Sequence, residues 1–223
     1  MKVSISGAGG KKFKTRSGDT VRLKALLDEG MERALAKLKE RGRDQELNEQ
    51  EMVAAQRAIA MGCIKYSDLA QDRIKNYEFS FDRMLDDRGN TAVYLLYSLA
   101  RIRSIIRNAH LDKPVEEIIK GTATLSLTHT RELRLAKYIL KFPEVITQVA
   151  EASTPHVLCA FLFELSVVFA EFYEQCYVIE RVRGQGDEMV TKVNYDRLLL
   201  CEATARILSL NLQLLGIQLV EKL

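Results

Sequence analysis

The sequence predicts an all-α protein, and three observations support that fold class. Only three prolines occur in 223 residues, and each (Pro114, Pro143, Pro155) stands where a helix could begin, a position that tolerates proline. Long runs rich in Leu, Ala, Glu, Lys and Arg repeat their apolar residues at helical spacing. Neither a strand–helix alternation nor an internal repeat is visible. We therefore expect a helical bundle in which short connections make neighbouring helices antiparallel.

The first two helices have recognisable ends. The first is expected to begin after residue 19 or 20 and to stop at Gly42. Asn48 can cap the second, with Glu51 three residues later as in a capping box, and this helix runs to about Tyr66. Between residues 76 and 81 the alternation of aromatic residues indicates a short extended segment.

The rest of the chain continues the helical pattern. Gly184 to Asp187 reads as a turn, and Gly216 as the C-terminal cap of the last helix. The leucines of Arg197 to Leu200, with Ile207, Leu210 and Leu214, are expected to form one buried face of that helix. The helices expected here cover about 90–108, a short stretch from 112, 130–140, a stretch opened by Pro143, 154–177 and 193–215.

Composition and charge exclude few classes of protein function. A net charge of +3 is too small to argue nucleic-acid binding without local clustering. No run approaches the roughly 18 apolar residues of a membrane span, and the first ten residues do not resemble a secretory signal. The cysteines form no CxxC pair and have no histidine at zinc-finger spacing, so we expect reduced core thiols and no metal site: Cys63, Cys159, Cys176 and Cys201.

One predicted helix carries a stripe of tyrosines and arginine. Tyr94, Tyr97 and Arg101 stand at i, i+3 and i+7, and three arginines but no acidic residue occur between Asn90 and His110. Such a surface suits single-stranded RNA, whose bases stack on aromatic rings while arginines meet phosphates. The same spacing also fits half-buried core tyrosines. From spacing alone both interpretations stay open.

A short basic loop lies near the start of the chain. Residues 11–18, KKFKTRSG, are bounded by glycines, and their cations could meet phosphate oxygens or simply be solvated. The GxxxxGK[ST] spacing of a Walker loop is absent. No other catalytic constellation is visible.

Taken together, several sequence segments resemble one protein family. The segment FSFDRMLDDRGNTAVYLLYSLARIRSI (79–105) is similar to the opening of the anticodon-binding domain in arginyl-tRNA synthetases of the eukaryotic cytosolic type. Only residues 1–10 look foreign to that family. The resemblance continues in order through KKFKTRSGDTVRL (11–23), CIKYSDL (63–69), KFPEV (141–145), EFYEQCY (171–177), RLLLCEAT (197–204) and LLGI (214–217).

The resemblance gives the basic loop a role. The loop looks like the KMSKS loop of class I synthetases, with Lys12 on its first lysine and Thr15 where the second would stand. By this carry-over Lys12, Lys14 and Arg16 would stabilise the phosphates of ATP, with magnesium, in the full enzyme. None of the three histidines belongs to an HxGH element. The catalytic site is thus expected to be incomplete, and this chain alone inactive and without bound cofactor.

The resemblance also implies where RNA binds. In the family a helical bundle grips the anticodon loop, and Tyr94, Tyr97 and Arg101 occupy positions near that loop. Tyr173 and Tyr177 match a second aromatic pair, although core packing of Tyr173 remains an alternative. Like the last residue of the family, Leu223 would approach the anticodon, but the chain ends differently from many relatives.

We therefore expect the C-terminal, anticodon-binding part of a cytoplasmic arginine–tRNA ligase. The expected partners are arginine tRNA, the missing N-terminal catalytic half and an assembly of several synthetases, with no membrane. The alternative is a non-catalytic helical module that docks proteins, whose binding would not fall steeply with salt. The expected parts are a leader and ATP loop (1–18), a connecting helical segment (19–76) and the anticodon-binding bundle (77–223).

Overall fold

The computed structural model describes residues 3–6, 22–122, 124–183 and 189–220, and within them it confirms the all-α fold class. The predicted loop residues Lys12, Lys14 and Arg16, the predicted turn at 184–187 and Leu223 lie outside these ranges. The helices are α1 (Leu23–Glu40), α2 (Glu49–Leu69), α3 (Phe81–Met84), α4 (Ala92–Asn108), α5 (Val115–Gly121), α6 (Thr130–Ile139), α7 (Phe142–Ala152), α8 (Pro155–Gln175) and α9 (Tyr195–Leu214), with a 3-10 turn at Arg43–Gln45.

The first two helices form an antiparallel pair. The predicted capping box is confirmed, since Asn48 Oδ1 accepts from the Glu51 N–H at 2.9 Å and the Glu51 carboxylate accepts from the Asn48 N–H at 3.0 Å. A Cβ at Gly30 of α1 would lie 3.1 Å from Ile64 Cδ1 of α2. Because glycine lacks that atom, the two helices can pack closely at this point.

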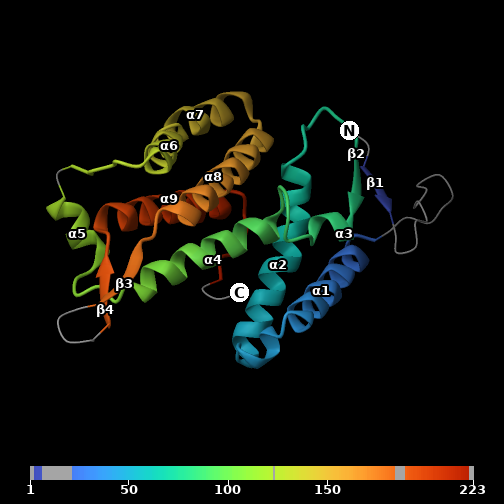
Figure 1. The fold of residues 1–223 in the computed structure, drawn as a ribbon. Coiled ribbons are helices and arrows are strands. Elements are labelled where there is room, and N and C mark those ends of the chain that lie inside the picture. The colour runs from blue at the N-terminus through green and yellow to red at the C-terminus, as the bar shows by residue number, and fades with distance from the viewer. Residues whose placement is uncertain (1–2, 7–21, 123, 184–188, 221–223) are drawn as a thin grey trace.

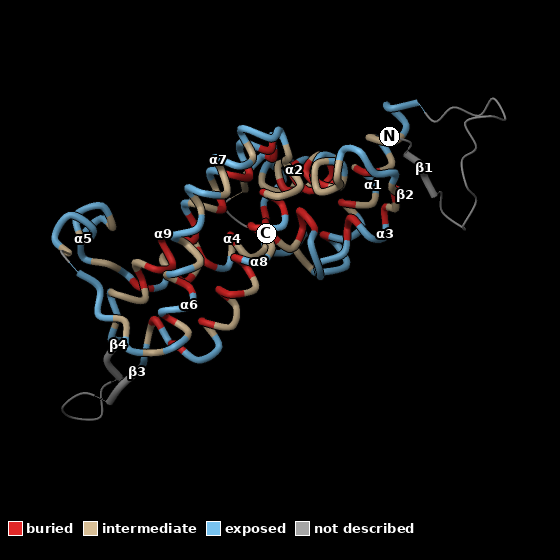
Figure 2. The backbone as a smooth tube through the Cα atoms, turned by 90° about the horizontal axis from the view of Figure 1, so that it is seen from above, coloured by how far each residue is buried: buried red, intermediate tan, exposed pale blue. Residues whose placement is uncertain are grey.

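Helix α4 joins two groups of helices. Figure 1 shows α1 and α2 at one end of the molecule and α6 to α9 at the other, with α4 running from the first group into the second. Leu95 and Ile102 on α4 are fully buried. Figure 2 shows that buried positions follow the inner sides of the helices, whereas α5 is largely exposed. One continuous core therefore holds the connecting helices and the bundle together.

Helix α8 is the most apolar helix. Among the described residues it is also the one helix long and apolar enough to cross a membrane by length and composition, but half of its most apolar stretch is buried within the protein. Leu162, Leu165 and Phe172 are fully buried between α6, α7 and α9. Its apolarity is therefore that of a core helix.

The strands were only partly anticipated. The extended segment near residues 76–81 is confirmed as β2 (Tyr77–Ser80), which pairs in parallel with β1 (Val3–Ser6). An antiparallel hairpin of β3 (Ile179–Arg183) and β4 (Met189–Val193) follows α8, which ends at Gln175 rather than at Tyr177. The helical periodicity of the chain gave no signal for β1 or for this hairpin.

The buried face of α9 also differs from the prediction. Leu210 and Leu214 are 48% and 60% exposed, so their assignment to the core is wrong. The buried stripe instead follows Leu198, Cys201, Ala205, Leu208 and Leu212, at steps of three and four residues. Because α9 carries leucines around most of its circumference, sequence spacing alone does not fix which side faces α4 and α8. The four cysteines are free and buried, as expected.

Candidate nucleic-acid interface

The loop before α4 fixes how that helix begins. Thr91 Oγ1 accepts from the Tyr94 N–H at 3.1 Å and donates to the Asp86 carbonyl at 2.7 Å. Gly89 has a φ of +75°, a conformation that side chains other than glycine rarely adopt. This turn and cap together set the rotation of α4, and so the direction of its tyrosines.

Tyr94 faces α8 and is half-buried. Its ring meets Phe163 edge-on, with 5.5 Å between ring centroids and an interplanar angle of 60°. Burial raises the pKa of Tyr94, while Ser98 and the charge of Arg101 partly offset that rise. Tyr94 therefore supports the seam between α4 and α8 and lies close to Arg101.

Arg101 lies on the same seam. Its guanidinium sits over the Tyr173 ring of α8, 5.2 Å from the centroid. Among the described residues no carboxylate pairs with Arg101, and the residue is exposed. The structure thus brings Arg101, Tyr94 and Tyr173 together and leaves the donors of the guanidinium available to a ligand.

Tyr173 fits both interpretations of its position, as a core residue and as a surface residue that could contact RNA. Its ring stacks on Phe169, with 6.1 Å between centroids and an interplanar angle of 12°, which is core-like packing. It is nevertheless only partly buried, and its other neighbour is the exposed Arg101. The ring is held in place from within the bundle and remains at the surface.

Tyr97 points to a different neighbour. The guanidinium of Arg41, the residue after α1, lies 4.7 Å from the centroid of the Tyr97 ring. Arg41 also forms an ion pair with Asp87, in the loop before α4. Sequence spacing placed Tyr97 and Tyr94 on one face of α4, but the structure directs Tyr97 towards α1 and Tyr94 towards α8. Arg41 carried no sequence signal, because its aromatic partner comes from another helix.

Tyr177 lies just beyond α8 and is 61% exposed. Its carbonyl accepts from an Arg197 Nη1 donor at 2.9 Å, and Arg197 Nε donates to Glu132 at 2.6 Å. Arg197 therefore ties the segment of Tyr177 to α6 and α9. The RLLLCEAT segment contains this arginine, but its spacing gave no hint of the partner on α6.

Glu132 is the buried residue of α6 to which Arg197 is bonded. Only 2% of the residue is exposed, and its carboxylate also accepts from the backbone N–H groups of Thr128 and His129. Burial by itself would raise its pKa, but these bonds and the ion pair with Arg197 hold the pKa of Glu132 below its ordinary value. An ionised carboxylate thus locks α6 to α9.

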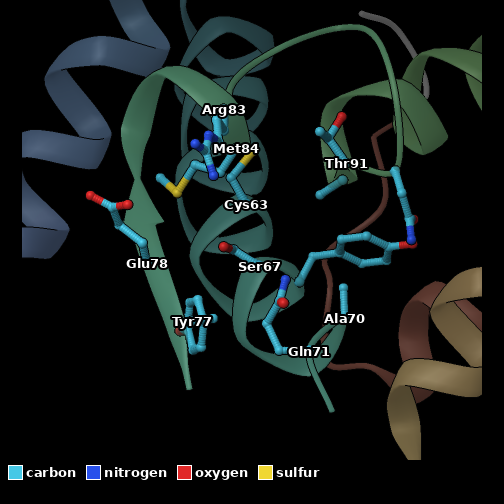
Figure 3. Close-up of a pocket in the computed structure, with 12 residues that line it drawn as sticks. Cys63, Ser67, Ala70, Gln71, Tyr77, Glu78, Arg83, Met84 and Thr91 are labelled. Atoms are coloured by element: carbon cyan, nitrogen blue, oxygen red, sulfur yellow. The ribbon is translucent and has the colours of Figure 1, made fainter. Parts of the chain in front are cut away.

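A polar cavity of about 190 Å³ opens at the junction between α2, β2 and the start of α4. Figure 3 shows Ser67 and Gln71 reaching into it from α2, with Tyr77 on β2 and Thr91 on the far side. None of the sequence-predicted RNA residues that the structure describes lines it. In the described part of the chain, no group of three or more His, Cys, Asp or Glu residues could hold a metal ion.

Comparison with family models assigns the two ends of the chain. The model for the DALR anticodon binding domain matches residues 95–223, more than half of the chain. The model described as tRNA synthetases class I (R), catalytic domain, matches residues 3–81. The expectation that residues 1–10 are foreign to the family is therefore wrong from residue 3 onward. These matches define the chain as class I aminoacyl-tRNA synthetase sequence with a helical anticodon-binding domain.

Individual relatives narrow the assignment. The chain is 50% identical over 220 residues to the cytoplasmic arginine–tRNA ligase of Xenopus tropicalis, covering 98% of this chain and 33% of that protein. A probable cytoplasmic arginine–tRNA ligase of Drosophila melanogaster is 51% identical over 220 residues, with 98% and 32% covered. This chain belongs to the arginyl-tRNA synthetase family, of the eukaryotic type. It spans about a third of the length of the curated relatives that it matches.

Solved structures agree with that assignment. Arginyl-tRNA synthetase of Plasmodium falciparum superposes with a TM-score of 0.74 at 35% identity, covering 91% of this chain and 34% of that one. The Thermus thermophilus enzyme also gives a TM-score of 0.74, at 26% identity, covering 99% and 34%. The predicted family and fold are confirmed.

Proposed function

We propose that this chain supplies the tRNA anticodon-binding part of an arginine–tRNA ligase, an enzyme that esterifies arginine to its tRNA with ATP. One observation carries the RNA site: the guanidinium of Arg101, without a carboxylate partner in the described structure, lies over the partly exposed ring of Tyr173. A guanidinium backed by an aromatic ring can hold a phosphate or stack with a base. The DALR match over residues 95–223 supports the same role.

The other predicted RNA residues have different roles in this proposal. Tyr177 is the most exposed tyrosine of the set and the best placed to stack on an unpaired base. Tyr94, which packs on Phe163, supports Arg101 from beneath the surface. Tyr97 and Leu223 are assigned to the anticodon loop by family resemblance.

The start of the chain is proposed to serve ATP. Lys12, Lys14 and Arg16 lie in the stretch matched by the catalytic-domain model, and they are the candidates to neutralise ATP phosphates together with magnesium. We divide the chain into the ATP-loop region (1–18), the connecting helices (19–76) and the anticodon-binding bundle (77–223). The relatives are named cytoplasmic, and we assign this chain to the same compartment.

Partners follow from this assignment. Arginine tRNA is the proposed RNA partner, and the N-terminal catalytic half that the family resemblance implies is the proposed protein partner. An assembly with other synthetases is a further proposal. The alternative of a purely protein-docking module has less support, because the family matches cover both ends of the chain with tRNA synthetase domains.

Titration with two tRNAs tests the proposal. The chain should bind arginine tRNA more tightly than an unrelated tRNA. Both affinities should fall as salt rises from low to physiological concentration, because binding releases counterions from the RNA and added salt makes that release less favourable. A protein-docking module would bind neither tRNA, or would bind both weakly and equally. Either of those results would refute the RNA role.

A further inference from the structure

Arg41 makes a contact between the two regions of the chain that the family models match. It follows α1, within the catalytic-domain match at residues 3–81, whereas its ring partner Tyr97 lies in the anticodon-domain match at 95–223. The guanidinium lies 4.7 Å from the Tyr97 centroid and forms an ion pair with Asp87. The residue that follows α1 therefore contacts Tyr97, a proposed RNA residue, directly.

The surroundings of Arg41 restrain the tyrosine. Asp87 belongs to the loop that caps α4, so Arg41 touches both the beginning of α4 and a ring on its second turn. Buried Leu38, Leu85 and Val93 line the same small space as Tyr97 and Arg41, a cavity of only about 10 Å³. Tyr97 is thus closely packed and has a guanidinium over its ring.

We propose that Arg41 is a positioning residue, which holds Tyr97 in the orientation that meets the anticodon loop. This inference rests on the proposed function. Ordering a side chain on binding costs affinity, and a ring that is already fixed avoids that cost. Loss of the restraint should therefore weaken RNA binding roughly 2- to 10-fold.

Helix α1 itself offers a matched control. Arg33, within α1, lies 5.1 Å from the Phe81 ring centroid and pairs with Asp82 at 3.0 Å. It makes the same kind of contact with a ring and an aspartate, but its ring is not a proposed RNA residue. Arg33→Ala thus removes equivalent chemistry from α1 without touching Tyr97.

The test measures the affinity of the whole 223-residue chain for an arginine anticodon stem–loop RNA at several salt concentrations. Arg41→Ala should lower affinity roughly 2- to 10-fold, Arg41→Lys should restore part of it, and Arg33→Ala should leave it unchanged. The slope of log affinity against log salt should stay the same in Arg41→Ala, because a positioning residue neutralises no phosphate.

A double-mutant cycle isolates the mechanism. In a Tyr97→Ala background, Arg41→Ala should have no further effect on affinity, since the ring that it positions is gone. Full additivity, a salt slope lower by about one, or unchanged or tighter binding by Arg41→Ala would each overturn the inference. If Arg41→Ala unfolds, Asp87→Asn takes its place, because it removes the ion pair and keeps the guanidinium. Failure of the unaltered chain to bind the stem–loop would instead overturn the proposed function, and this inference with it.

Discussion

At the scale of single residues, the candidate RNA site depends on two guanidinium–tyrosine contacts. Arg101 covers Tyr173 and Arg41 covers Tyr97, but only Arg41 is neutralised by a carboxylate in the described structure. A cation without a carboxylate partner keeps its donors for a ligand, whereas a paired cation acts through its geometry. The two pairs therefore have different proposed roles, one in contacting RNA and the other in orienting a ring.

Tyr173→Ala tests the contact role. Base–aromatic stacking with cation–π contributions from Arg is worth about 1–3 kcal/mol per base, so loss of the ring that backs Arg101 should weaken binding of arginine tRNA roughly 5- to 150-fold while helicity is retained. Tyr138→Ala is the matched control, because Tyr138 also stacks on a phenylalanine (Phe161) and lies beneath a cation (Lys141). Equal losses of affinity in the two variants would point to packing as the role of Tyr173.

Spacing suggested candidate residues for the site but not their partners. A helix repeats its face every three to four residues, which grouped Tyr94, Tyr97 and Arg101 on one face. The structure keeps Tyr94 near Arg101 but directs Tyr97 towards α1. Arg41 was not identifiable, since its ring partner is more than fifty positions away and the contact depends on how α1 packs near α4. Contacts between helices are decided by tertiary packing, which a single sequence pattern does not encode.

At the scale of elements, Glu132 joins α6 to α9 and orders the segment that carries Tyr177. Its pKa is lowered in the folded protein, so its ionisation stabilises the fold above the ordinary glutamate pKa of about 4.3. That stabilisation is lost as pH falls through the lower folded pKa. The acid limb of the stability curve should therefore depend on this residue.

Glu132→Gln tests the tie between the helices. We expect the free energy of unfolding at pH 7 to fall by about 2–3 kcal/mol, because Arg197 loses a buried charged partner, and the stability of the variant should change less between pH 5 and 3. Urea unfolding across that pH range measures both effects. Glu116→Gln, which removes an exposed ion pair with Arg206, should cost at most about 1 kcal/mol. An unchanged acid limb in Glu132→Gln would contradict the assignment.

The starts of several helices were predicted well, whereas of the strands in the described residues only β2 was expected. The Asn48 capping box and the prolines near the starts of α5, α7 and α8 are local signals that act within one turn of helix. The pairing of β1 with β2 joins residues more than seventy positions apart, so no local pattern reports it. The rotation of α9 was ambiguous because that helix has leucines on its exposed side as well.

At the scale of the whole molecule, α1 leads to a contact between the two regions that the family models match. Its 18 residues span about 27 Å, from just after the region of the proposed ATP loop to Arg41 at Tyr97. The α1–α2 pair and the bundle share one continuous core through α4. The described residues therefore form one packed unit from a stretch that matches the catalytic-domain model and a stretch that matches the anticodon-binding model.

Catalysis should nevertheless need sequence beyond these residues. Residues 1–223 alone are expected to give no arginine-dependent ATP–pyrophosphate exchange, because none of their three histidines lies in an HxGH element. The cytoplasmic arginine–tRNA ligase of Xenopus tropicalis, assayed in parallel, serves as the positive control. Exchange by the 223-residue chain above background would show that it contains a complete activation site.

The central claim is that this bundle reads the anticodon loop of arginine tRNA. The most direct measurement compares the affinity of the chain for an arginine anticodon stem–loop with its affinity for the same stem carrying a scrambled loop, at physiological salt. We predict tighter binding of the arginine loop, by roughly tenfold or more, since each base that is stacked or read contributes about 1–3 kcal/mol. Equal affinity for the two loops would contradict the claim and leave only non-specific attraction to phosphate.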